Sequence, residues 1–319
     1  MMTATGGCCL LTPTWSGDLD HFRLLRMSLS GSPLATLPHY VIVQTEDVEA
    51  FRAYDTEPVR LLTTADVLPP RIEARRRRAC AISARVGRHW TRIGGSLKRS
   101  LGLPRWPAYT GWHTQQLCKL WMANELDVDR VIVLDSDVIV TPHATVDHFA
   151  AEGRYRCFAT WENREALSGK VRNWVDQAER LIGAAPMVDS QVNTYFDTPF
   201  ILDVPVVRRM LAWLEETHGR PWYDVMLAQP PRRWSEFGTY KAFLAGYYAE
   251  DAIDWRPPDV SRYLYQASDM EALMREIAML LEDPGVHYIT LHSQSSGRQR
   301  WPMTDFEVQL QSLLEKTEY

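Results

Sequence analysis

The stretch Arg130-Val131-Ile132-Val133-Leu134-Asp135-Ser136-Asp137 decides the fold class of this chain. Four apolar residues in a row do not alternate between two faces, so they predict a strand that is covered on both sides, as in a parallel sheet between layers of helices. Ligands of such sheets bind beyond the carboxyl ends of the strands. The sequence therefore places Asp135 and Asp137 at an edge where a ligand is expected.

The two aspartates of this stretch form a candidate metal site. Asp135 and Asp137 are two residues apart in an extended segment, so their side chains point the same way. Two carboxylates this close repel each other unless a cation lies between them, and oxygen ligands suit Mg²⁺ or Mn²⁺. The alternative interpretation is that one aspartate caps the next turn and the other is only solvated.

Other apolar runs predict further strands, with helices between them. The first strands are expected at 8–12, 40–44 and 59–62, with helices starting at 18 and 48. This order favours an α/β fold with a Rossmann-like, mostly parallel central sheet and helices on both faces. Later strands are predicted at 155–161, 191–202 and 286–291, and later helices at 111–126, 206–218, 237–248, 270–281 and 306–316. A single domain over residues 1–319, with one sheet shared throughout, is expected.

Composition limits the class of protein. The 319 residues are 45% hydrophobic and 11% aromatic, which is enough for a substantial core. No segment approaches the ~20 apolar residues that span a bilayer, and no Lys or Arg precedes Arg23, so a cytoplasmic location is expected. The five scattered cysteines fit a reducing compartment.

A basic segment interrupts the predicted sheet at about 71–105. The whole chain has a formal net charge of -5, yet this segment contains Arg75-Arg76-Arg77-Arg78 and further basic residues, with Glu73 as its one acid. We predict a mobile insertion that is either a solvated loop or a peripheral contact with an anionic membrane surface or an acceptor. Nucleic acid is not an expected partner, because aromatic residues are sparse there.

The order of several short motifs resembles the GT-A class of nucleotide-sugar glycosyltransferases, and more closely an uncharacterised bacterial family thought to belong to that class. The motifs are Gly111-Trp112, Gln115-Gln116 with Lys119, Asp135-Ser136-Asp137, Ser235-Glu236-Phe237 with Tyr240, and His292. The resemblance runs from about Leu10 to His292 and leaves the basic segment out. It implies a GT-A-like fold in which the Asp-x-Asp motif binds Mn²⁺ or Mg²⁺, and the metal bridges the diphosphate of a nucleoside-diphosphate sugar.

The resemblance also implies roles for the metal ligands. Asp137 would be the main ligand, and Asp135 would bind nearer the ribose or through water. His292 follows a predicted apolar strand, and by itself it reads as an exposed or hydrogen-bonded histidine. The resemblance makes it a third ligand, and its imidazole would favour Mn²⁺ over Mg²⁺.

Several polar residues are candidates for contacts with the nucleotide. Thr12, Pro13 and Thr14 stand at the end of the first strand, and Gln44 ends the second, where nucleotides bind in this fold class. A plain turn is the alternative for the first three.

One predicted helix carries a second group of candidates. Gln115, Gln116 and Lys119 lie on one side of this helix by spacing, so they offer amide donors and a cation to a phosphate or ribose. Surface solvation is the alternative for these three.

Glu236 is the candidate catalytic base. It lies between Trp234 and Phe237, where an aromatic wall and a carboxylate suit a sugar hydroxyl whose proton is removed in an inverting mechanism. The resemblance aligns it with the family's Ser-Glu-Phe motif. A carboxylate that caps the following helix is the alternative, and Glu250 and Asp251 are reserve candidates.

The favoured function is a metal-dependent glycosyltransferase that moves a sugar from a nucleoside-diphosphate sugar to an unidentified acceptor, such as a glycan. Two alternatives remain open. In a haloacid-dehalogenase-like phosphatase Asp135 would be the nucleophile and Asp137 the acid or base, although that motif normally opens its domain and here three predicted strands precede it. A non-catalytic nucleotide-sugar binder would use the aromatic residues as stacking surfaces.

Overall fold

A five-stranded sheet forms the centre of the computed structural model, which describes residues 7–82, 84–85, 110–183, 191–230, 233–265, 270–292 and 303–317. Its strand order is β3-β2-β1-β4-β9. The strands are β1 (Cys8–Pro13), β2 (His39–Val43), β3 (Val59–Thr63), β4 (Arg130–Val133) and β9 (Phe200–Asp203). The first four run parallel, and β9 runs antiparallel to β4. The predicted α/β fold with a mostly parallel sheet is confirmed.

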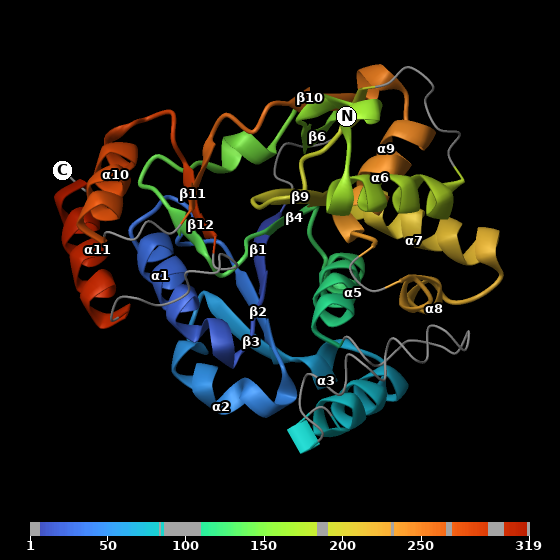
Figure 1. The fold of residues 1–319 in the computed structure, drawn as a ribbon, viewed down its shortest axis with the longest axis horizontal. Coiled ribbons are helices and arrows are strands. Elements are labelled where there is room, and N and C mark those ends of the chain that lie inside the picture. Colours follow the sequence, from blue (N-terminus) through green and yellow to red (C-terminus); the bar gives the residue numbers. More distant parts are fainter. Residues whose placement is uncertain are drawn as a thin grey trace.

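Helices cover both faces of this sheet (Figure 1). The first helix, α1 (Leu19–Ser30), lies on one face, while α5 (Thr110–Glu125) and α7 (Val204–His218) lie on the other. The apolar residues of β4 from Val131 to Val133 are therefore fully buried. This is why the run in the sequence does not alternate between apolar and polar residues.

The chain leaves the central sheet at the Asp-x-Asp segment and enters a second sheet. That sheet has the order β11-β12-β5, with β5 (Val138–Val140) antiparallel to β12 (Tyr288–His292) and β11 (Ser261–Tyr265) parallel to it. Helices α10 (Met270–Glu282) and α11 (Met303–Thr317) pack against it, beside α1 (Figure 1). Leu24 of α1 belongs to the apolar core of this unit, while Leu25 belongs to the main core. Helix α1 thus joins the two sheets.

Smaller elements complete the fold around α9. Two two-stranded sheets pair β10 with β6 and β7 with β8. Their strands are β6 (Tyr155–Phe158), β7 (Trp161–Asn163), β8 (Gln191–Asn193) and β10 (Ile253–Arg256). Further helices are α2 (Val48–Phe51), α3 (Thr64–Val67), α6 (Gly169–Ile182), α8 (Trp222–Leu227) and α9 (Glu236–Tyr247). Helices α6 and α9 pack directly against each other.

Two predictions about the sheet are wrong. The sheet is not shared throughout the chain, because the described strands fall into four separate sheets. The predicted strand at 191–202 is two strands, β8 and β9, which belong to different sheets. Pro199 lies between them and has no N–H group to donate to a ladder.

The beginning of the predicted mobile basic insertion is helical instead. Residues 70–82 form a helix, in which Ile72, Arg76 and Ala79 are buried at helical spacing. The rest of the insertion, residues 86–105, lies outside the described residues. Among the residues that the structure describes, no helix is long and apolar enough to cross a membrane.

Candidate functional site

The carboxyl ends of the central strands bring the predicted site residues to one edge of the sheet. Thr14 follows β1, Gln44 follows β2, and Asp135 lies two residues beyond β4. The backbone N–H of Thr14 donates to the carbonyl of Ile42 (2.8 Å), and that of Leu134 donates to the carbonyl of Leu11 (3.0 Å). The predicted convergence on one sheet edge is therefore present in the structure.

Asp135 is the accessible carboxylate of this edge. Its side chain is 49% exposed, and its Oδ1 lies 3.4 Å from Nζ of Lys119. Its backbone N–H donates to Oγ1 of Thr198 (3.2 Å). Asp135 is thus fixed by its backbone while its carboxylate faces both a cation and solvent.

Asp137 and His292 reach the same place through the second sheet. The N–H of Leu291 donates to the carbonyl of Asp137 (2.8 Å). Thr290 pairs with Val138, and His292 lies two residues further along β12, next to the residue that is bonded to Asp137. The His292 ring stacks on the Tyr263 ring, with centroids 5.7 Å apart. Asp137 and His292 are therefore linked through the pairing of β5 with β12.

These ligands are not arranged as a finished metal site. Within the described ranges, no group of three His, Cys, Asp or Glu side chains is close enough to hold a metal ion. The types of donor nevertheless suit a divalent cation, because two carboxylates and an imidazole are ligands that Mn²⁺ accepts. Asp137, Asp135 and His292 as metal ligands stay a prediction.

Lys119 of α5 connects this edge to helix α9. Its Nζ is 3.4 Å from Oδ1 of Asp135 and 3.2 Å from Oε1 of Glu236, and its side chain is 5% exposed. It also lies over the ring of Phe237, 4.5 Å from the centroid. Burial lowers the pKa of Lys119, but the two carboxylates outweigh burial and raise the pKa above its usual value. Lys119 is therefore a charged ammonium beside Asp135.

Glu236 does not face the open side of the site. The residue is 1% exposed, its Oε1 is next to Lys119, and its Oε2 accepts from the Ser235 hydroxyl (3.2 Å). Its backbone N–H donates to Oε1 of Gln116 (3.2 Å). Burial raises the pKa of Glu236, and the Lys119 ammonium opposes this rise. These surroundings differ from those of a base that must touch an acceptor hydroxyl.

The two glutamines of α5 have different positions. Gln116 is buried and braces α9 through Glu236, whereas Gln115 is half-buried. The predicted use of Gln116 in nucleotide binding therefore does not match its buried contact with α9. The Glu236 carboxylate does not cap the following helix, because Ser235 is the N-cap of α9 and its hydroxyl accepts from the N–H of Gly238.

The end of β1 contributes less to the site than predicted. Thr12 is fully buried, and its hydroxyl is hydrogen-bonded to Nε2 of His39 (2.9 Å), so it is not available to a nucleotide. Pro13 is buried as the last residue of β1. The hydroxyl of Thr14 is buried and has no hydrogen-bond partner among the residues with described positions. Of these three, only Thr14 has a polar side-chain atom that is not already used.

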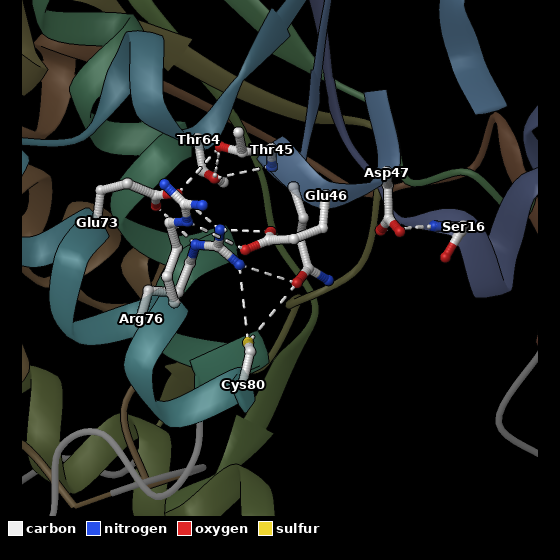
Figure 2. Close-up of polar contacts among 10 residues, drawn as sticks. Ser16, Thr45, Glu46, Asp47, Thr64, Glu73, Arg76 and Cys80 are labelled. Atoms are coloured by element: carbon white, nitrogen blue, oxygen red, sulfur yellow. Dashed lines mark hydrogen bonds and ion pairs between the residues drawn. The ribbon is translucent and has the colours of Figure 1, made fainter. Parts of the chain in front are cut away.

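Gln44 belongs to a partly buried polar cluster. Its Oε1 accepts from Nη1 of Arg76 (3.0 Å), and Figure 2 shows Arg76 beside Glu73 and Glu46. Thr45 donates from its hydroxyl to Glu73 (3.0 Å). The predicted position of Gln44 at the sheet edge is correct, and Arg76 is a partner that the sequence did not suggest.

Asp197 is a site residue that the sequence reasoning missed. It precedes Thr198, which binds the backbone of Asp135, and it interacts electrostatically with His292 and Asp135. The residue is solvent-accessible, but the protein packed around its carboxyl raises the pKa of Asp197 above its ordinary value. Because β9 is antiparallel, the residues before it lie at the same edge as the residues after β4. No pattern in the sequence shows that β9 runs antiparallel to β4.

Lys241 of α9 holds the segment before Asp197. Its Nζ donates to the carbonyls of Asn193 (2.9 Å) and Tyr195 (2.5 Å) and lies 3.9 Å from the centroid of the Phe196 ring. Burial lowers the pKa of Lys241 to about 7. Helix α9 thus positions both Lys119, through Glu236, and the segment that carries Asp197.

Solved structures with a similar arrangement include glycosyltransferases. The galactosyltransferase LgtC, solved with donor and acceptor sugar analogues, is 14% identical, with a TM-score of 0.47 over 96% of this chain and 95% of that one. Core-mannan synthase A of Aspergillus fumigatus, solved in an Mn/GDP form, is 10% identical, with a TM-score of 0.43 over 80% and 74%. The mannosyltransferase Ktr4p of S. cerevisiae, solved with GDP, is 11% identical, with a TM-score of 0.43 over 99% and 82%.

Comparison of the sequence with protein families gives one match. No curated protein matches the sequence. Residues 12–270 match the model of a family described as a family of unknown function, DUF6492. This match begins within β1, includes the Asp-x-Asp segment and helix α9, and ends at the start of α10, so His292 lies beyond it. Because it spans most of the chain, the protein belongs to the DUF6492 family.

Proposed function

We propose that this protein is a metal-dependent glycosyltransferase that moves a sugar from a nucleoside-diphosphate sugar to an acceptor. The main support is the half-exposed carboxylate of Asp135, which stands at the carboxyl edge of a parallel sheet beside a buried ammonium. A nucleotide bound at such an edge places its phosphates near the strand ends. The order of motifs that resembles nucleotide-sugar glycosyltransferases agrees with this position.

A divalent cation would be held by Asp137 and His292, with Asp135 as a further or water-mediated ligand. The oxygen and imidazole donors of this set suit Mn²⁺, and Mg²⁺ to a lesser degree. When bound, the metal would stabilise negative charge on the leaving diphosphate. The register of β5 and β12 supports this set, because it carries His292 to the Asp-x-Asp turn.

Lys119 would supply fixed positive charge to the same reaction. Its ammonium is buried beside Asp135, so it acts in a medium of low dielectric constant, where a charge interacts strongly with its neighbours. Oxygen atoms of a diphosphate next to Asp135 would come close to this ammonium. The side chain needs no rearrangement to stay charged, because Glu236 remains its partner.

Glu236 would then act as a positioning residue and not as the base. Its carboxylate is enclosed by Lys119 and Ser235, so it holds the ammonium at the sheet edge without touching an acceptor. The earlier prediction of Glu236 as base requires its side chain to leave this position. The carboxyl of Asp135 is half-exposed, and Asp197 is an exposed residue that interacts electrostatically with it.

Exposed positive charge supports the proposal for where the acceptor is met. Arg75, Arg77 and Arg78 are exposed on the helix formed by residues 70–82. They are available to an anionic surface, such as the inner face of a membrane that carries a glycan precursor. A cytoplasmic protein with peripheral membrane contact would fit these residues.

The test is the stability of the full chain with nucleoside diphosphates. A ligand that binds only the folded state raises the melting temperature, and at 100 times its Kd it contributes about 2.7 kcal/mol. We expect at least one of UDP, GDP, CDP and ADP to stabilise the protein, and to do so more strongly with Mn²⁺. Asp137→Asn should remove the extra effect of Mn²⁺, while the exposed Asp305→Asn on α11 should keep it.

Two outcomes would contradict this proposal. One is a protein that no nucleoside diphosphate stabilises at millimolar concentration, with or without Mn²⁺. The other is trapping of beryllofluoride on Asp135, which would support the phosphatase alternative with Asp135 as its nucleophile.

A further inference from the structure

The guanidinium of Arg76 is buried at the ends of β2 and β3. The side chain is 1% exposed. Its Nε and Nη2 donate to the two carboxylate oxygens of Glu73 (both 2.6 Å), and Nη2 also donates to Glu46 (2.6 Å). Nη1 donates to Oε1 of Gln44 (3.0 Å) and also contacts Sγ of Cys80 (3.7 Å), which Figure 2 shows beside Arg76. A bidentate pair of this kind fixes the plane of the guanidinium.

This contact fixes the orientation of the Gln44 amide. A guanidinium has only donors, so it must face the oxygen of the amide and not its nitrogen. The amide nitrogen of Gln44, with two N–H donors, then points away from Arg76. In the part of the chain that the structure describes, this nitrogen makes no hydrogen bond, and Gln44 is half-buried. The sheet edge therefore presents a fixed hydrogen-bond donor here.

Gln44 lies at a suitable distance from the phosphate-binding end of the site. It follows β2, Thr14 follows the neighbouring β1, and Asp135 lies beyond β4 on the other side of β1. Adjacent strands are about 4.8 Å apart, so the ends of β2 and β4 are separated by roughly 10 Å. A ribose and diphosphate can bridge this separation, which leaves the base of the nucleotide near Gln44.

We propose that Gln44, held by Arg76, selects the donor nucleotide by donating a hydrogen bond to a carbonyl oxygen of its base. This inference rests on the proposed function. Uracil and guanine carry a carbonyl oxygen where cytosine and adenine carry an amino group. The N–H group of Gln44 can donate to the carbonyl oxygen of uracil or guanine. It disfavours the amino group of cytosine or adenine, because two donors would then face each other without an acceptor. The donor substrate is therefore a sugar linked to UDP or GDP, whose bases carry a carbonyl oxygen at C4 of uracil or C6 of guanine.

Arg76 is the positioning residue in this arrangement. Without it, the Gln44 amide could turn over and present its oxygen, which would remove the selection. Glu73 receives one further hydrogen bond from the Thr45 hydroxyl, which helps to keep its carboxylate in place beside the guanidinium. The buried ion pair of Arg76 and Glu73 therefore fixes the orientation of the Gln44 amide.

Binding of UDP and CDP to the full chain with Mn²⁺, measured by calorimetry, tests this directly, because the two bases differ at the exocyclic group and the adjacent ring nitrogen. We expect the wild-type protein to bind UDP at least roughly 10-fold more tightly than CDP, or GDP more tightly than ADP by the same factor. Gln44→Glu keeps the shape and pairs with Arg76, but offers oxygens in place of the amide nitrogen. This variant should lower the ratio of UDP affinity to CDP affinity, or of GDP affinity to ADP affinity, at least 10-fold. Its affinity for Mn²⁺-pyrophosphate should stay unchanged.

Two further variants make the test specific. Gln309→Glu on the exposed side of α11 is the matched control and should keep the wild-type ratio. Arg76→Lys, checked for folding by circular dichroism, should weaken the selection and preserve pyrophosphate binding. The inference would be overturned, while the proposed function stands, if the wild type bound UDP as tightly as CDP and GDP as tightly as ADP. An unchanged affinity ratio in Gln44→Glu would overturn it as well. Absence of binding by every nucleotide and by pyrophosphate would remove the proposed function and this inference together.

Discussion

Lys119 is the residue on which the electrostatics of the candidate site depend. It is a buried ammonium between a half-exposed carboxylate, Asp135, and a buried one, Glu236. A buried charge without a partner is very unfavourable, so each carboxylate helps to keep the ammonium in the protein. Glu236 can serve this purpose permanently because no solvent competes for it. Asp135 is then free to exchange its contact with Lys119 for a ligand.

Glu236→Gln distinguishes the two roles considered for this residue. If Glu236 positions Lys119, the amide no longer offsets the burial of the ammonium, so the pKa of Lys119 falls and the fixed positive charge at the sheet edge is partly lost. Nucleotide affinity and the rate of sugar-nucleotide hydrolysis should then both fall, each by roughly 5- to 20-fold, the effect of about 1–2 kcal/mol. If Glu236 is the base, transfer should fall by about 10²–10⁴ while nucleotide affinity stays constant. Titration calorimetry and initial rates separate these outcomes, and the exposed Glu216→Gln on α7 is the control.

The site residues that could be predicted from the sequence are those set by one strand and its end. Asp135 after a buried apolar run, and Gln44 after another, lie where the pattern puts them. Residues whose contacts depend on distant elements could not be predicted. The hydroxyl of Thr12 pairs with His39, 27 positions away, and Gln116 braces Glu236, 120 positions away. Spacing along one helix does not show which neighbour another helix will bring.

At the scale of elements, short strands and changes of direction limited the prediction. The strand β5 begins directly after Asp137 and has three residues, so it reads as a continuation of the turn. Its pairing with β12 is antiparallel and long in range, and no local pattern encodes it. The long apolar runs of β1, β2 and β4 were predictable because burial on both faces leaves a composition that loops do not have.

The edge strand β9 carries a carboxyl group that should make stability depend on pH. Asp203 is buried, and burial raises its pKa to about 6, although Arg130 and Tyr240 oppose the rise. Between about pH 4 and pH 6 the folded protein then holds a proton that the unfolded chain releases. Through this group, the free energy of unfolding should fall by about 1–3 kcal/mol as the pH rises across that window.

Asp203→Asn should remove this contribution. The amide still accepts from the Tyr240 hydroxyl, which lies 3.2 Å from Oδ2 in the wild type. Urea unfolding at pH 4, 5, 6 and 7 should therefore show a decline for the wild type that is smaller in the variant. The exposed Asp305→Asn should keep the wild-type profile. Identical pH profiles for Asp203→Asn and the wild type would contradict the assignment.

At the scale of the whole molecule, the candidate site depends on the contact between two sheets. Asp135 belongs to the end of the central sheet, whereas Asp137 continues into β5 of the second sheet and His292 ends β12. A change in the packing of the second sheet would therefore move Asp137 and His292 relative to Asp135. The element between the sheets is α1, which contributes to both apolar cores.

Helix α1 should therefore make the two sheets unfold together. Leu24 is 2% exposed in the second core, and Leu25 is 0% exposed in the main core. Truncation of either buried side chain to alanine should lower the free energy of unfolding by about 2–5 kcal/mol. Because both side chains belong to one helix, each variant should unfold in a single transition that coincides by tryptophan fluorescence and far-ultraviolet circular dichroism. If Leu24→Ala instead unfolded in two steps, with only the first shifted, the second sheet would be an independent unit, and the shared-helix explanation of the site would fail.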